Sequence, residues 1–199
     1  MAGKIYHIPL SKILKIDNVS MGGKHPVVIQ SMANVSTRNI DDSVAQCKRM
    51  VKAGAQLVIF TTQGTKELEA LSMIIEKLQK EKLEVPIVAD VHFSAKVAYE
   101  AAHICDKVRI NPGNFTERKR NKTNFSDEEY LIGLEENKQE LLKLIQICKV
   151  KNTSLRIGVN HGSLSDRIMS RFGDSPEGMV ESALEFIRIC KGADFHQVV

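Results

Sequence analysis

The sequence predicts an α/β fold in which helices cover a parallel β-sheet. Short apolar runs of β type alternate with amphipathic helical segments along the 199 residues, and this alternation is typical of consecutive βα units. About six such units can be counted, and the chain stops inside the sixth strand. No GxGxxG motif follows any strand, which disfavours a doubly wound sheet. We therefore expect a TIM-type (β/α)8 barrel, with residues 1–199 forming one incomplete barrel.

The first half of the chain shows clear periodicity. The helical segment 41–54 carries its apolar residues on one face and has Gly54 as its C-terminal stop. A later helix has Ser94 as a candidate N-cap. The strands predicted in this half are 26–31, 56–61, 85–93 and 107–111, and the helices are 41–54, 65–82 and 94–105.

The second half begins with a long polar and charged segment, residues 115–139, which merges into a helix. The last helix has strong end signals, with Ser175 at the N-cap, Pro176 at the first helical position and Gly192 just past the end. The elements predicted here are helix 136–149, strand 154–160, helix 175–192 and a strand opening at 195–199.

Composition excludes several functional classes. The net charge of +4 is mild, and the one dense basic run, 117–122, is interpreted as a solvated loop, so nucleic acid is not an expected partner. No apolar run could span a bilayer, and residues 1–16 lack the features of a signal peptide, so we expect a cytoplasmic protein with no membrane partner. No CxxC motif is present, and the cysteines are expected to be buried free thiols: Cys47, Cys105, Cys148 and Cys190.

Two strand ends resemble one another. VRINPGN (108–114) and LRIGVNHGS (155–163) each place an arginine inside an apolar run that then breaks into a small polar turn. The catalytic and binding residues of βα barrels lie at the carboxyl ends of the strands. By the two-residue period, Arg109 shares a face with Asn111, and Arg156 shares one with Asn160.

An arginine that points into a barrel is costly unless it is paired or faces an anion. The planar guanidinium suits a phosphate, so Arg109 and Arg156 could clamp a diphosphate, with loop N–H groups of 112–114 and 161–163 facing the same anion. The alternative is an internal salt bridge between Arg109 and Asp90 on the adjoining strand.

The ends of the other strands carry weaker signals. Asp90 and His92 share a face, where they could hold polar groups of a substrate or pass a proton; alternatively, Asp90 caps a loop and His92 packs against its neighbour. Gln30, Ser31 and Asn34, after the first strand, fit either rim hydrogen bonds or turn chemistry.

Taken together, these stretches resemble one family. QSM, PIVADVHF, VRINPGN, RIGVNHGSL and MVESALEF occur in order over nearly the whole chain, as in the N-terminal barrel of the 4-hydroxy-3-methylbut-2-enyl-diphosphate synthases. The resemblance implies an oxidoreductase of isoprenoid biosynthesis by the methylerythritol phosphate pathway. Its enzymes reductively convert 2-C-methyl-D-erythritol 2,4-cyclodiphosphate to 4-hydroxy-3-methylbut-2-enyl diphosphate. Electrons reach a 4Fe-4S cluster from ferredoxin or flavodoxin, and the enzymes are homodimers.

The resemblance also implies roles for residues of this chain. Arg109 and Arg156 would bind the diphosphate, Asn111 and Asn160 would line the same mouth, and Asp90 and His92 would border the hydroxyl side of the substrate. The cluster belongs to a C-terminal iron–sulfur domain absent from this chain, so no metal ligand and no catalytic residue is assigned here. We therefore expect the fragment alone to be inactive.

The chain departs from the family pattern at two places. Ile59 stands where the family usually has an arginine, so one anion ligand is missing. The long polar segment after VRINPGN resembles the larger form of the family, which has a further inserted domain.

Two readings outside this family stay open at this point. A pterin-binding synthase or methyltransferase also places Asp, Asn and Arg at barrel strand ends. A non-catalytic alternative is self-association through the exposed edges of an unclosed sheet.

Overall fold

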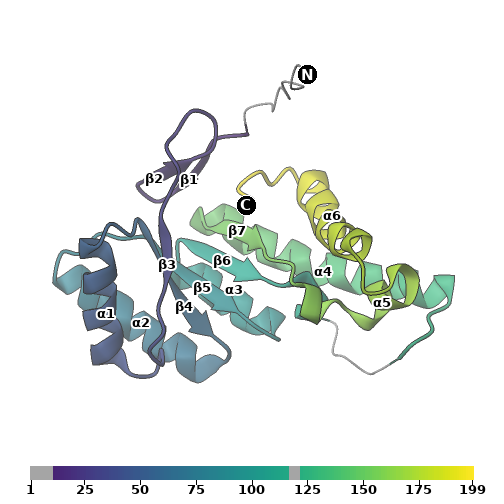
Figure 1. The fold of residues 1–199 in the computed structure, drawn as a ribbon, viewed down its shortest axis with the longest axis horizontal. Helices are drawn as coiled ribbons and strands as arrows, with labels where there is room; N and C mark the ends of the chain where they lie inside the picture. Colours follow the sequence, from purple (N-terminus) through teal and green to yellow (C-terminus); the bar gives the residue numbers. More distant parts are fainter. Residues whose placement is uncertain (1–10, 117–121) are drawn as a thin grey trace, which may run out of the picture.

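The computed structural model describes residues 11–116 and 122–199 (Figure 1). Its centre is a five-stranded parallel sheet in which the strands follow one another in chain order. The strands are β3 (Gln30–Met32), β4 (Leu57–Thr62), β5 (Ile87–Val91), β6 (Lys107–Ile110) and β7 (Ser154–Ile157). This stepwise order is that of a βα barrel, and within the described residues the sheet stays open.

The expected sixth strand is present as a single parallel bridge between Leu155 and Val198. The Leu155 N–H donates to the Gln197 carbonyl at 2.8 Å, and the Val199 N–H donates to the Leu155 carbonyl at 2.9 Å. The order of the sheet therefore continues past β7 as the alternation of elements predicts.

Helices follow the strands. The predicted N-caps are confirmed, because Ser94 accepts a hydrogen bond from the Val97 N–H and Ser175 accepts one from the Gly178 N–H. The helices are α1 (Ile40–Lys52), α2 (Thr65–Lys80), α3 (Ala95–Ile104), α4 (Asp127–Lys151), α5 (Asp166–Phe172) and α6 (Pro176–Gly192), with 3-10 turns η1 (Pro112–Asn114) and η2 (His161–Ser163).

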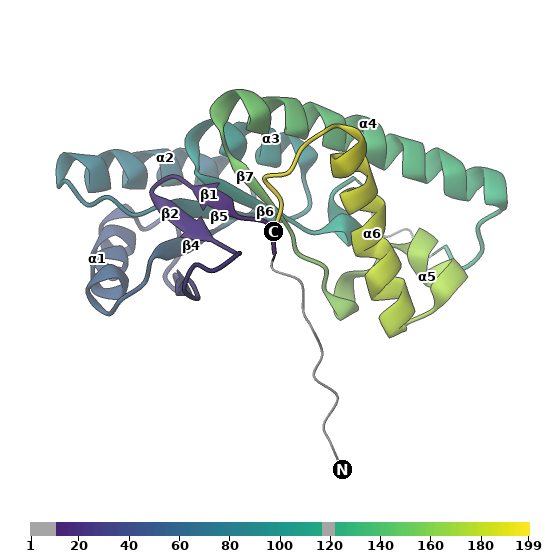
Figure 2. The same cartoon turned by 90° about the horizontal axis from the view of Figure 1, so that it is seen from above.

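Helix α4 begins earlier than predicted, inside the segment interpreted as polar loop. A capping box starts it: the Ser126 hydroxyl accepts from the Glu129 N–H at 3.2 Å, and the Glu129 carboxylate accepts from the Ser126 N–H at 3.0 Å. The helix then packs against both α6 and α3 (Figure 2). The basic run 117–122 falls, except for Lys122, outside the described residues.

Two small elements were not predicted. One is helix α5, and the other is an antiparallel hairpin of β1 (Leu14–Ile16) and β2 (Val19–Met21). Strands of three residues are too short to show a period of two. Asp17, in the turn of the hairpin, has φ +48, a left-handed conformation that Asp tolerates better than most residues.

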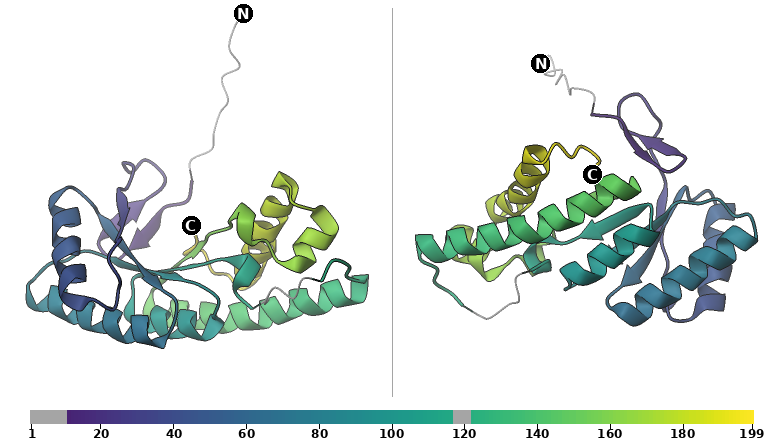
Figure 3. Two further views of the ribbon diagram at one scale, coloured as in Figure 1. Left: turned by 60° about the horizontal axis from the view of Figure 1, so that its bottom comes forward. Right: turned by 180° about the vertical axis from the view of Figure 1, so that it is seen from behind.

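The sheet has two different faces. The face toward the helices forms the main core, which includes Val58, Phe60 and Val108. On the opposite face, called here the inner face, Leu14 and Ile16 of the hairpin pack against Leu57 and Val88. The hairpin lies on the other side of the sheet from α2, α3 and α4 (Figure 3). The hairpin thus covers the start of the inner face and leaves the carboxyl ends of the strands uncovered.

The prediction for the thiols is confirmed. All four cysteines are buried and free: Cys47, Cys105, Cys148 and Cys190. Burial raises the pKa of each thiol, to about 11 for Cys47 and to about 12 for Cys190. Thiols that stay protonated and buried are poor nucleophiles and poor metal ligands.

Candidate functional site

Three charged residues form one row on the inner face, at the carboxyl ends of neighbouring strands. In the ladder of the sheet, Asp90 of β5 is the partner of Arg109 of β6, and Arg109 is the partner of Arg156 of β7. Their side chains therefore leave the sheet side by side on the same face. This group is called the arginine row below. The two arginines thus lie side by side, which a clamp for a diphosphate would require.

Arg109 is fixed at both ends of its guanidinium. Nη1 donates to Asp90 Oδ1 at 2.9 Å, and Nη2 donates to the Gly158 carbonyl at 2.7 Å. The side chains of Arg109 and Asp90 are 17% and 13% exposed, so this ion pair lies largely out of water. The internal salt bridge considered as an alternative is thus present. A guanidinium has five N–H donors, so these two bonds do not exhaust it.

Asp90 is shared between two partners. Its second oxygen, Oδ2, lies 3.2 Å from His92 Nε2. Burial alone would raise the pKa of Asp90, but hydrogen bonds from His92 and Arg109 and the charge of Arg109 outweigh it, and the pKa is lowered. Asp90 is therefore an anion at neutral pH. Its position makes it an anchor for Arg109 and His92 rather than a proton donor.

Arg156 differs from Arg109 because its side chain is exposed. It lies beside Arg109 in the ladder, and among the described residues it has no hydrogen bond or salt bridge. Arg156 is thus a cation at the carboxyl end of β7 that remains available to a ligand.

Both asparagines at the strand ends are used within their own loops. Asn111 Oδ1 accepts from the Gly113 N–H at 3.0 Å, and Asn160 Oδ1 accepts from the Gly162 N–H at 3.1 Å. Each therefore caps the 3-10 turn that follows its strand. The side-chain nitrogen of Asn111 reaches the neighbouring loop, where Nδ2 donates to Ser163 Oγ at 2.6 Å.

The expectation that these two loops offer free backbone N–H groups is wrong for most of their residues. The Gly113 and Gly162 N–H groups are held by the asparagine side chains. Those of Asn114 and Ser163 are held by the Asn111 and Asn160 carbonyls, at 3.1 Å and 3.0 Å. Turn formation itself uses these four donors, so they are not free to bind an anion.

The two loops are in direct contact, and Gly113 makes that contact possible. A Cβ on Gly113 would lie 1.8 Å from the Ser163 carbonyl oxygen. We expect Gly113→Ala to lower the free energy of unfolding by about 1–3 kcal/mol, because backbone must move to accommodate the methyl group. Urea unfolding checks this. Gly192→Ala is the control, since nothing lies within 4 Å of its added Cβ; equal effects for the two variants would contradict the contact.

Sequence reasoning missed one charged residue of the inner face, Lys107. It lies two residues before Arg109 and so shares its face, which the sequence could have shown. Lys107 is 2% exposed, and its Nζ donates to Gln30 Oε1 at 2.6 Å. Burial, with a smaller contribution from the charge of Arg156, lowers the pKa of Lys107 to about 8.

The remaining residues at the strand ends have mixed outcomes. Asn34 hydrogen-bonds with Gln46 of α1 through both its backbone N–H and its side chain, so both groups are used within the protein. Ile59, where an arginine was expected, packs against the apolar cluster under the hairpin. It stands in the same ladder row as Val88 and Lys107. That row therefore has a lysine on β6 and none of the expected charge on β4.

The described residues do not fit a metal centre. No three His, Cys, Asp or Glu side chains among residues 11–116 and 122–199 lie close enough to hold a metal ion. No helix in the described part of the chain is long and apolar enough to cross a membrane. The inner face instead combines three cations, Lys107, Arg109 and Arg156, with one carboxylate, Asp90. This excess of positive charge suits an anionic ligand.

Comparison with known proteins agrees with this architecture. Residues 11–199 match the family model described as the GcpE TIM-barrel domain. A 4-hydroxy-3-methylbut-2-en-1-yl diphosphate synthase (flavodoxin) of Bacteroides fragilis is 50% identical over 188 residues, which are 94% of this chain and 30% of that protein. The chloroplastic ferredoxin-named synthase of Arabidopsis thaliana is 42% identical over 191 residues, which are 95% of this chain and 26% of that protein.

The chain thus spans about a third or less of the curated relatives it matches. Among solved structures, a phospho-2-dehydro-3-deoxyheptonate aldolase from Thermotoga maritima superposes with a TM-score of 0.58 at 12% identity, over 96% of this chain and 46% of that one. At that identity the likeness supports the fold alone.

Proposed function

We propose, from the premise that this chain belongs to the family of the GcpE TIM-barrel domain, that it is the substrate-binding barrel of a 4-hydroxy-3-methylbut-2-en-1-yl diphosphate synthase. Relatives with that name share 42–50% of its residues. The substrate of the whole enzyme would be 2-C-methyl-D-erythritol 2,4-cyclodiphosphate, which it would convert reductively in isoprenoid biosynthesis. The match to this family does not favour the pterin-binding alternative.

The observation that carries the proposal is the arginine row. Arg109 and Arg156 are ladder partners at the carboxyl edge of the sheet, where barrel enzymes bind their substrates. Asp90 holds Arg109 in place through the 2.9 Å bond, so the guanidinium is oriented before a ligand arrives. Arg156, exposed, would close on the second phosphate of a diphosphate from the neighbouring strand.

The other predicted site residues fit supporting roles in this proposal. His92, held by Asp90 at 3.2 Å, would lie beside the hydroxyl side of the substrate. Asn111 and Asn160 would shape the mouth through the turns that they cap, since their amide oxygens are already engaged. These residues bind and orient; we assign no bond-breaking step to them.

Redox chemistry would be supplied from outside the described residues. The family resemblance implies a 4Fe-4S cluster in a separate domain, and the described residues of this chain offer no ligand set for one. Relatives are named for flavodoxin or ferredoxin, and we propose one of these as the electron donor. A homodimer, a cytoplasmic location and the inserted domain stay predictions.

Replacing Arg156 by methionine tests the proposed anion site. We expect affinity for inorganic diphosphate to fall at least about tenfold, because a charge-assisted hydrogen bond contributes about 1.5–3 kcal/mol. The melting temperature should stay within about 2 °C of the parent, since Arg156 is exposed and has no described partner. Titration calorimetry and thermal melting give both values.

The control is Lys52→Met, which removes an exposed positive charge of α1 away from the inner face. If Lys52→Met and Arg156→Met weaken diphosphate binding equally, the binding reflects net charge and the proposed site is wrong.

A further inference from the structure

Lys107 is an unusual residue for its position. It belongs to β6, its side chain leaves the sheet on the inner face, and only 2% of the residue is exposed. Its Nζ reaches Gln30 Oε1 at 2.6 Å. Gln30 is on β3, which is three places from β6 in the order of the sheet. The ammonium group therefore points across the inner face rather than out to solvent.

The contacts of Lys107 leave its charge without compensation. A buried lysine is normally paired with a carboxylate. Here, among the described residues, the hydrogen-bond partner of Nζ is a neutral amide. The one carboxylate of the arginine row, Asp90, is already bound by Arg109 and His92. Arg156, on the neighbouring strand β7, adds a like charge, which contributes to lowering the pKa of Lys107.

A structural role for Lys107 would be a tether between β6 and β3. Such a tether needs hydrogen bonding but no charge, and an uncharged side chain would avoid the cost of burying a cation. A role in binding an anion explains why the side chain at this position is positively charged. Lys107 precedes Arg109 by two residues on β6. It therefore lies on the same face, further from the carboxyl end of the strand.

We propose that Lys107 is a third cation of the anion site and binds the phosphate oxygens that enter deepest below Arg109 and Arg156. Gln30 holds the ammonium group in place when no anion is present and is released, or shares it, when one binds. The ligand class is a diphosphate. Asp90 already offsets the charge of Arg109, so the arginine row has an excess of only one positive charge, fewer than the two negative charges that even a cyclic diphosphate carries. This inference rests on the proposed function, because it concerns the same site.

Substitutions of Lys107 and of Gln30 distinguish a role in ligand binding from a role as a tether. We expect Lys107→Met to lower affinity for inorganic diphosphate by about tenfold or more. Gln30→Met should leave that affinity unchanged or raise it, because it frees the ammonium group. A tether predicts instead that both substitutions have the same effect on affinity, since each removes the same hydrogen bond. Titration calorimetry on the 199-residue chain measures both.

A second variant covers the case in which Lys107→Met fails to fold. Gln30→Glu keeps both side chains in contact and supplies an internal carboxylate to Lys107. It should raise the melting temperature and lower diphosphate affinity, because the new anion competes with the ligand. Unchanged affinity in a folded Gln30→Glu protein would overturn the proposal.

The outcomes also distinguish this inference from the proposed function. If Arg156→Met weakens diphosphate binding and Lys107→Met does not, the anion site stands and the role of Lys107 is overturned. If the parent chain does not bind diphosphate, or Arg156→Met binds as the parent does, the proposed function and this inference both fail. Lys52→Met again controls for net charge.

Discussion

Replacing Arg109 by methionine is expected to lower the free energy of unfolding by about 2–4 kcal/mol at neutral pH. The reason is Asp90, whose side chain is only 13% exposed and which the substitution deprives of its 2.9 Å partner. His92 remains as its one described side-chain partner. Methionine fills a similar volume, so no large cavity forms. The loss of stability therefore arises mainly from the unpaired Asp90 carboxylate.

The pH dependence of this loss identifies its cause. In the parent, the pKa of Asp90 is lowered by His92 and Arg109 against the effect of burial. Its ionised form therefore contributes stability above about pH 4, the ordinary value for Asp, and this contribution is lost as the pH falls through the lowered pKa. Without Arg109 the pKa should rise. The stability difference between parent and variant should then be large at pH 7 and become small only when the pH falls below the lowered pKa of Asp90 in the parent.

Urea unfolding at both pH values measures the effect. Arg38→Met is a matched control, since Arg38 Nε forms a 2.5 Å ion pair with Glu67, but the Arg38 side chain is 58% exposed. An exposed pair contributes about 0–1 kcal/mol. A loss for Arg109→Met that is equally small, or that does not change with pH, would show that Asp90 does not depend on Arg109.

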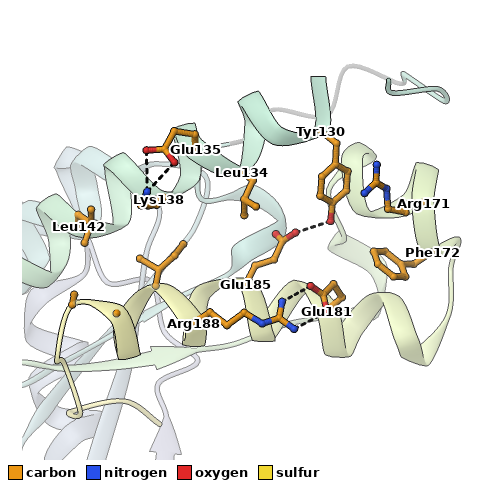
Figure 4. A pocket seen from close by; sticks show the side chains of 13 residues that line it. Tyr130, Leu134, Glu135, Lys138, Leu142, Arg171, Phe172, Glu181, Glu185 and Arg188 are labelled. Carbon is orange, nitrogen blue, oxygen red and sulfur yellow. Dashed lines mark hydrogen bonds and ion pairs between the residues drawn. The ribbon is translucent and has the colours of Figure 1, made fainter. Parts of the chain in front are cut away.

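Glu185→Ala is expected to destabilise the chain by about 3–5 kcal/mol. Glu185, on α6, accepts hydrogen bonds from two groups. Arg167 of α5 donates from both terminal nitrogens at 2.8 and 2.7 Å, and the Tyr130 hydroxyl of α4 donates at 2.6 Å (Figure 4). The side chains of Arg167 and Glu185 are 2% and 4% exposed. Removing the carboxylate takes away the two hydrogen bonds that it accepts from a buried guanidinium and the one that it accepts from the Tyr130 hydroxyl.

Two features make this cluster the junction of three helices. The Arg167 and Arg171 guanidinium groups lie 4.5 and 3.9 Å from the centre of the Tyr130 ring, so the ring contacts two cations of α5. Burial and the hydrogen bond to Glu185 raise the pKa of Tyr130, which keeps its hydroxyl a donor. The cluster borders an open pocket of about 610 Å³ that includes Leu134 and Ile189 in its lining.

The control for Glu185→Ala is Glu181→Ala on the same helix. Glu181 pairs with Arg188 at 2.5 Å, but the Arg188 side chain is 59% exposed. Its loss should cost about 0–1 kcal/mol. Denaturant unfolding of both variants compares a buried with an exposed ion pair. Similar losses would contradict the assignment of Glu185 as the buried anchor of α5.

The sequence was sufficient for the sheet and for the face of each charged residue. The two-residue period of a strand predicts that Arg109 and Arg156 point to the inner face, where they are neighbours in the sheet. The same period puts Asp90 on that face. It could not show how the loops close. The asparagines satisfy their own turns because those backbone donors are nearer than any ligand.

Other features were present in the sequence but were not used. Ser126 and Glu129 have the spacing of a capping box, which marks the start of α4. Lys107 has the parity of Arg109. The pairing of Arg167 with Glu185 depends on how α5 and α6 pack, and no local pattern encodes it.

Titration of 2-C-methyl-D-erythritol 2,4-cyclodiphosphate into the 199-residue chain tests the central claim, that the arginine row is an anion site. The account predicts saturable binding by the parent, weaker binding by Arg109→Ala and by Arg156→Ala, and none detectable when both are replaced. Circular dichroism confirms that each variant is folded. Binding by the folded double variant that equals that of the parent would contradict the claim.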